Sequence, residues 1–168
     1  MVELAPATEF ANELLARLVE LGVEHVVLAP GSRSQALALT AAALEERGDI
    51  SLHVRIDERV AGFLALGIGI ETRKPAVVIT TSGTAVANLH PAVLEAHHAG
   101  VPIILLTADR PEEARGIGSN QTTDQRDLFG NAVRLSVDEP APVRGATSTR
   151  RASELAQQAW LAATDAHA

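Results

Sequence analysis

Three short polar segments carry the side chains whose types and spacing could support chemistry. The first is APGSRS at 29–34, which directly follows a short apolar run. Gly31 permits close backbone approach, and Ser34 suits the start of a helix. An arginine fork beside the free N–H groups of a helix start can bind anions. The segment therefore predicts an anion site at Arg33, and an ordinary turn with a solvated arginine is an equal alternative.

The second segment is RIDER at 55–59, at the start of a predicted helix. Acidic side chains there suit the helix macrodipole, which accounts for Asp57. Glu58 is better explained by a position facing a partner subunit, because the helix that follows is small and apolar. Its small residues would leave room for a second helix, and we expect an interface between subunits along Ala61, Gly62, Ala65, Gly67 and Gly69.

The third group of polar residues comprises TTSGT at 80–84 with Asn88, and ADRP at 108–111 with the loop that follows. The threonines could do no more than cap a helix, and Asn88 and Arg110 could be ordinary surface groups. Amide side chains in a long loop beside a strand end suit ligand contacts, which makes Asn120 and Gln121 candidates.

The elements that must position these segments are short apolar strands that alternate with helices. Strand–helix–strand order with uninterrupted apolar strands predicts an α/β fold, an open and mainly parallel sheet with helices on both faces. Ligands in such sheets bind beyond the carboxyl ends of the strands, where all three segments lie. The pattern predicts helices at 7–21, 35–46, 57–70, 85–99 and 148–163, strands at 26–28, 52–54, 76–79, 103–106 and 133–137, and a long loop at 108–127.

Composition excludes several classes of protein. The length of 168 residues suits one domain, and 46% apolar residues can fill its core. A net charge of −7 argues against nucleic-acid binding, which needs a basic surface. The absence of cysteine excludes disulfides and a thiolate nucleophile, and a cytoplasmic setting is the default. The first ten residues are not typical of a targeting signal, and no stretch is long enough to span a membrane.

The common nucleotide and hydrolase motifs are missing. Gly67 and Gly69 lie inside a predicted helix, so they do not form a dinucleotide fingerprint. The TSGT turn lacks the glycine that a nucleophile elbow requires. His97 and His98 are adjacent and would point apart on a helix, which argues against a zinc pair there. From the residues alone, the prediction is an anion-binding α/β domain.

Four motifs in the expected order resemble one enzyme family. The segments are APGSRS at 29–34, RIDERVAGFLALGIG at 55–69, TTSGTAVANLHPAVLEA at 80–96 and LLTADRPEE at 105–113. They resemble the 2-succinyl-5-enolpyruvyl-6-hydroxy-3-cyclohexene-1-carboxylate synthases of menaquinone biosynthesis. The resemblance implies a transferase that uses thiamine diphosphate and Mg²⁺ to decarboxylate 2-oxoglutarate and add the product to isochorismate.

The resemblance also implies roles for individual residues. Glu58 matches the family's essential glutamate, which hydrogen-bonds the pyrimidine ring of the cofactor and favours its imino tautomer. Pro30, Thr81 and Asn88 match positions that line the pyrimidine pocket. The positions that match the substrate side, where arginine forks suit carboxylates, are Ser32, Arg33, Arg110, Asn120 and Gln121.

Only part of such an enzyme is expected in this sequence. The resemblance implies that residues 1–168 form a single N-terminal pyrimidine-binding domain, without the central and diphosphate-binding domains, so that the chain alone is inactive. Mg²⁺ would be bound by the missing C-terminal domain, and the whole enzyme would be a homodimer or homotetramer. Another thiamine-diphosphate carboligase, such as an acetohydroxyacid synthase, and a non-catalytic binding module of the same fold remain alternatives.

Overall fold

A parallel sheet of four strands forms the centre of the molecule, which we describe from a computed structural model covering residues 3–165. The strands are β1 (His25–Leu28), β2 (Ser51–Val54), β3 (Ala76–Thr80) and β4 (Ile103–Thr107), in the spatial order β2-β1-β3-β4. The helices are α1 (Pro6–Glu20), α2 (Gln35–Glu46), α3 (Glu58–Thr72), α4 (Thr84–Ala87), α5 (His90–Ala99) and α6 (Ala146–Thr164), with short 3-10 turns at Ser32–Ser34, Glu112–Ala114 and Gly130–Ala132. The predicted fold class is confirmed.

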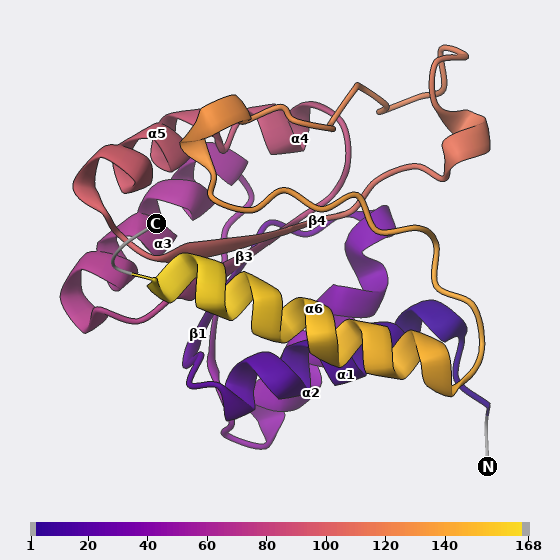
Figure 1. Ribbon diagram of the computed structural model, residues 1–168, viewed down its shortest axis with the longest axis horizontal. Helices are drawn as coiled ribbons and strands as arrows, with labels where there is room; N and C mark the ends of the chain where they lie inside the picture. Colours follow the sequence, from indigo (N-terminus) through magenta and orange to yellow (C-terminus); the bar gives the residue numbers. More distant parts are fainter. Residues whose placement is uncertain (1–2, 166–168) are drawn as a thin grey trace.

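Helices cover both faces of the sheet, as Figure 1 shows. Successive residues of β1 point to opposite faces: Val26 packs among the side chains of α1, α2 and α6, whereas Val27 packs among those of α3 and α5. The same alternation holds in β3, all five residues of which are buried. A strand covered on both sides has no polar face, which explains why its sequence is an uninterrupted apolar run.

Four of the five small residues of α3 pack within this chain. Ala61 and Ala65 are fully buried against the sheet. A Cβ atom added to Gly62 would lie 2.9 Å from the Cβ of Ala92 in α5, and one added to Gly69 would lie 2.8 Å from Val101. The interface expected along these residues is therefore wrong for Ala61, Gly62, Ala65 and Gly69, which are buried within the chain, whereas Gly67 is open to solvent.

Two other expectations fail for local reasons. The helix expected at 85–99 is divided into α4 and α5, because Pro91 has no N–H to donate to the carbonyl of Ala87 and its ring crowds that carbonyl. The strand expected at 133–137 does not form, since no fifth strand joins the sheet in the described residues. This segment is instead attached through side chains: Arg134 donates to main-chain oxygens at the end of α6, at 2.5 Å for Asp165.

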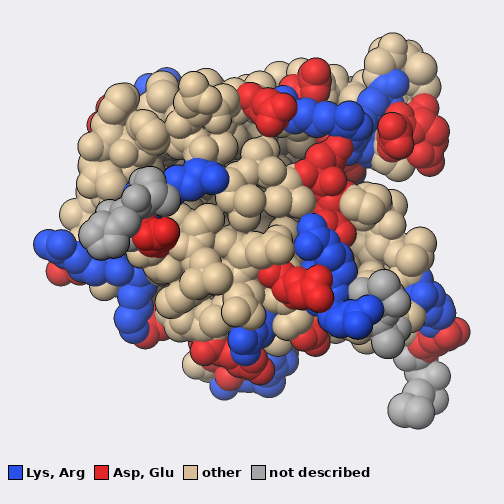
Figure 2. Space-filling model, in the orientation of Figure 1, with Lys and Arg blue, Asp and Glu red and all other residues tan. Residues whose placement is uncertain are grey.

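Charged side chains of both signs are mixed on the surface. On the face shown in Figure 2, acidic and basic groups are intermingled, both on the side where the long loop after β4 lies and along the lower edge. That face carries no continuous basic patch of the kind that nucleic acids require. Separately, no helix described between residues 3 and 165 combines the length and apolar character needed to cross a membrane.

Candidate functional site

The turns after β1 and β3 touch at the carboxyl edge of the sheet. Ala29 continues the ladder by donating its N–H to the carbonyl of Ile79 (2.9 Å), and Ala108 does the same to Thr80 (3.0 Å). Gly31 then lies so close to Thr81 that a Cβ at position 31 would be 2.4 Å from the Thr81 Cβ. Only glycine fits there, and this close approach brings the predicted turns together.

Two hydroxyl groups at this junction are buried without a partner. The Oγ1 atoms of Thr80 and Thr81 are inaccessible to solvent and have no hydrogen-bond partner among the described residues. Buried polar atoms are almost always paired, because leaving one unpaired costs about 1–3 kcal/mol. Thr81 thus keeps an unpaired hydroxyl at the β1–β3 junction, while the neighbouring Pro30 is exposed.

Glu58 is the first residue of α3 and is half-buried. The helix starts there because Asp57 caps it: the Asp57 Oδ1 accepts a hydrogen bond from the N–H of Val60 at 2.9 Å. The Oε2 of Glu58 accepts a hydrogen bond from the Asn88 Nδ2 at 3.2 Å. Asn88 lies at the break between α4 and α5, so the division of that helix gives the glutamate a polar neighbour.

Arg33 and Arg110 converge on one main-chain oxygen. Arg33 donates to the carbonyl of Asn120 at 3.2 Å, and Arg110 donates twice to the same oxygen, at 3.2 and 2.7 Å. Arg33 also donates to the Ser82 Oγ and the Gln121 Oε1, both at 3.0 Å. The structure therefore brings together four of the five predicted substrate-side residues, although Asn120 participates through its main chain; Ser32 is exposed in the same turn.

The loop that carries Gln121 is fastened to the TSGT turn. The Ser82 Oγ donates to the carbonyl of Gln121 at 2.8 Å, and the N–H of Gly83 donates to the Gln125 Oε1 at 2.8 Å. Gln125 in turn donates to the carbonyl of Ala108 at 3.0 Å. Gln125 thus connects the ends of β3 and β4.

A cluster of ion pairs around Arg115 contacts the main chain of Arg110. The sequence analysis did not predict this cluster. The Arg115 guanidinium binds Asp109 at 2.9 Å and Asp138 at 2.7 Å, and it also donates to the main-chain carbonyl of Arg110 at 2.9 Å. Arg126 adds a second contact to Asp138 at 2.8 Å. No spacing rule would reveal Arg115, since its partners lie 6 and 23 residues away in an irregular loop.

These contacts change the ionisation of the paired groups. Hydrogen bonds from Arg115 hold the pKa of Asp138 below its ordinary value; partial burial opposes this, and the charges of Arg115 and Arg126 reinforce it. The hydrogen bond to Asp138 likewise raises the pKa of Arg115. Both groups therefore stay charged around neutral pH, which keeps the ion-pair cluster assembled.

Sequence comparison assigns this architecture to a known family. Residues 8–128 match the family described as "Thiamine pyrophosphate enzyme, N-terminal TPP binding domain". The chain belongs to this family. The matched range of this thiamine pyrophosphate enzyme domain includes all four strands and every site residue predicted from the sequence, whereas Asp138 of the ion-pair cluster lies beyond it.

Individual relatives of this thiamine pyrophosphate enzyme domain carry one name, 2-succinyl-5-enolpyruvyl-6-hydroxy-3-cyclohexene-1-carboxylate synthase. The protein from Leifsonia xyli subsp. xyli is 61% identical over 161 residues, which is 96% of this chain and 27% of that protein. The protein from Clavibacter michiganensis subsp. michiganensis is 60% identical over 160 residues, which is 95% of this chain and 27% of that protein. The protein from Thermobifida fusca is 49% identical over 158 residues, which is 94% of this chain and 28% of that protein. The chain therefore spans about a quarter of the length of these relatives.

Proposed function

We propose that this chain is the pyrimidine-binding domain of a synthase that decarboxylates 2-oxoglutarate and joins it to isochorismate in menaquinone biosynthesis. The name shared by relatives up to 61% identical supports this reaction. The observation that carries it is the placement of Glu58, half-buried at the start of α3 and in contact with Asn88. When bound, thiamine diphosphate supplies the electron sink for decarboxylating a 2-oxo acid.

The pyrimidine end of the cofactor fits the residues present. The buried Thr81 hydroxyl needs a polar partner, and Gly31 leaves the backbone around it free of side chains. Pro30, Thr81 and Asn88 would line the ring. Glu58 would share a proton with a ring nitrogen, as a partly buried carboxyl group can do at modest energetic cost.

The substrate side of the proposed site contains two arginines held in place before any ligand binds. Arg33 and Arg110 already share a neutral acceptor, the Asn120 carbonyl, and a substrate carboxylate could replace it with charge-assisted hydrogen bonds. Gln121 would contribute through its side chain, which already meets Arg33. Ser32 would add a hydroxyl from the same turn.

The described residues do not provide a site for Mg²⁺. Between residues 3 and 165, no three His, Cys, Asp or Glu side chains are grouped so that they could hold a metal ion. Mg²⁺ prefers oxygen ligands, above all carboxylates and phosphates. We therefore propose that the chain is one domain, and that Mg²⁺ and the diphosphate are bound by further domains of the enzyme. A cytoplasmic location, supported by the absence of cysteine, is part of the same proposal.

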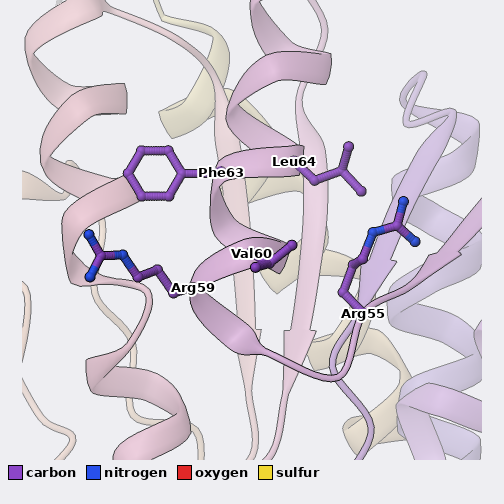
Figure 3. Close-up of a pocket in the computed structure, with 5 residues that line it drawn as sticks. All are labelled: Arg55, Arg59, Val60, Phe63 and Leu64. Carbon is purple, nitrogen blue, oxygen red and sulfur yellow. The ribbon is translucent and has the colours of Figure 1, made fainter.

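The proposed homo-oligomer would use the exposed face of α3. Val60 and Phe63 are 51% and 39% exposed, and Ile56 and Ile70 are 83% and 55% exposed. Val60, Phe63 and Ile70 are successively three and seven residues apart, which places them on one side of α3, and Ile56 lies just before the helix. Figure 3 shows Val60 at the centre of an open pocket, with Arg59 and Phe63 on one side and Arg55 and Leu64 on the other.

The direct test is an assay of the enzyme that contains this chain, with thiamine diphosphate and Mg²⁺ added. We expect carbon–carbon bond formation from 2-oxoglutarate and isochorismate, and none from two molecules of pyruvate. Product from pyruvate alone would identify an acetohydroxyacid synthase. Tight cofactor binding without product from either mixture would identify a non-catalytic module.

A further inference from the structure

Two histidines meet on neighbouring strands, outside the site described above. His25 begins β1 and His53 is the third residue of β2, and the parallel register pairs them with Ser51 and Val27 respectively. They are thus two residues apart in register and point to the same face of the sheet. The Nδ1 of His25 lies 3.3 Å from the Nε2 of His53, and both side chains are partly buried.

The separation of these nitrogen atoms matches two ligands of one metal ion. Nitrogens bound to tetrahedral zinc at 2.0–2.1 Å are about 3.3–3.4 Å apart. Without a metal ion, one ring N–H donates to the other ring across this distance, and a metal ion bound between the two nitrogens would replace that proton. The ring centroids are 5.4 Å apart and the ring planes are tilted by 33°, so the rings approach end to end and are not stacked. We propose that His25 and His53 form a two-imidazole site for a divalent transition-metal ion such as Zn²⁺.

The surroundings determine what kind of site this is. The carboxylate of Glu45 lies close by and accepts the N–H of Leu52 at 3.2 Å, while the carboxylate of Glu24 is paired with Lys74. Because no third protein ligand is grouped with the pair in the described residues, water must complete the coordination. Such a site is weak, and it selects metals that accept imidazole over Mg²⁺, which prefers oxygen.

A metal ion bound here would connect the edge strand β2 to the central strand β1. β2 has only one neighbour in the sheet, and its first and last residues are exposed. A ligand that binds only the folded state stabilises it according to its concentration. Zn²⁺ should therefore raise the unfolding temperature of the chain, and Mg²⁺ at the same concentration should not.

The test uses the untagged 168-residue chain titrated with ZnCl₂ and, separately, with MgCl₂. Calorimetry should show one Zn²⁺ per chain, and the affinity should fall at least about tenfold in His25→Gln and in His53→Gln, because one imidazole replaces two. The double variant His97→Gln/His98→Gln is the matched control: it removes two adjacent, exposed histidines at the end of α5 and should leave the affinity unchanged.

Nitrogen NMR of the histidine rings gives a readout that needs no variant. In the wild-type chain, Zn²⁺ should shift the His25 Nδ1 and the His53 Nε2 together, at the same metal concentration. Equal affinity in wild type and both single variants would overturn the proposal, as would shifts confined to His97 and His98. Loss of binding in the control double variant alone would also overturn it.

Discussion

Two glycines of α3 lie in contrasting surroundings, so the same substitution should have opposite effects at the two positions. Gly67→Ala adds a methyl group where, apart from the adjoining residues and backbone of its own helix, no atom lies within 4 Å. Alanine is favoured over glycine inside a helix by about 0.5–1 kcal/mol. Gly67→Ala should therefore raise the free energy of unfolding by roughly that amount.

Gly62→Ala gains the same stabilisation from helix propensity, but its new methyl group would collide with Ala92 of α5 and with Leu89. The new Cβ would lie 2.9 Å from the Ala92 Cβ and 3.3 Å from the Leu89 Cδ2, well inside the 3.5–4.0 Å that two carbon atoms prefer. Overpacking of this kind costs about 1–3 kcal/mol. After the helical gain of about 1 kcal/mol is subtracted, the net effect is a loss of roughly 0–2 kcal/mol. The two variants should thus differ by about 1–3 kcal/mol.

Urea unfolding of the chain, followed by far-UV circular dichroism, measures both values. Ala92→Gly removes the methyl group that Gly62→Ala would strike, so the double-mutant cycle should show a favourable coupling of about 1–3 kcal/mol. Equal stabilisation by Gly62→Ala and Gly67→Ala would refute the packing of α3 on α5. If Gly62→Ala altered the oligomeric state at unchanged monomer stability, the small residues would form a subunit interface after all.

Three further predictions concern the site and its supports. In the enzyme that contains this chain, Glu58→Gln should lower kcat by about 10²–10⁴ while thermal stability is retained; loss of stability in parallel with activity would argue for a structural role. Asp57→Ala should destabilise the chain by about 0.5–2 kcal/mol through loss of the α3 cap, and Asp57→Asn, which can still accept the Val60 N–H, should be close to wild type in urea unfolding. Because the folded-state pKa of Asp138 is depressed, its contribution to stability is present above the ordinary carboxyl pKa of about 4 and is lost as the pH falls below it; acid unfolding curves of wild type and Asp138→Asn should therefore converge at low pH, and a constant gap would contradict the ion-pair account.

The sequence predicts most of the fold because its signals are local. The bounds of α2 are those expected, since a glycine-containing turn precedes it and Gly48 follows it. The buried strands are recognisable because they have no polar face. Errors arise where a single backbone property outweighs periodicity, as at Pro91, or where one apolar pattern fits two partners. Small residues on α3 predict close packing, but they do not show whether α5 or another subunit packs there.

The candidate site was predictable only in part. Parallel strands end at one edge, so the approach of the Arg33 and Ser82 turns follows from topology. The meeting of Arg33 and Arg110 on the Asn120 carbonyl does not, because it depends on the path of an irregular loop in which Gln121 has a positive φ of 54°. Arg115 escapes sequence reasoning for the same reason, since its partners become neighbours only once the loop has folded.

The hydrogen bonds from Arg33 and Arg110 to the Asn120 carbonyl have a kinetic consequence. If a substrate carboxylate binds these arginines as proposed, it meets two side chains that are already ordered. It would first have to displace the main-chain oxygen of Asn120, which accepts hydrogen bonds from three N–H groups. The arginine side chains then lose little rotational freedom when the ligand binds. The observed rate of complex formation should therefore reach a plateau at high ligand concentration. The plateau would equal the rate at which the hydrogen bonds from Arg33 and Arg110 to the Asn120 carbonyl break.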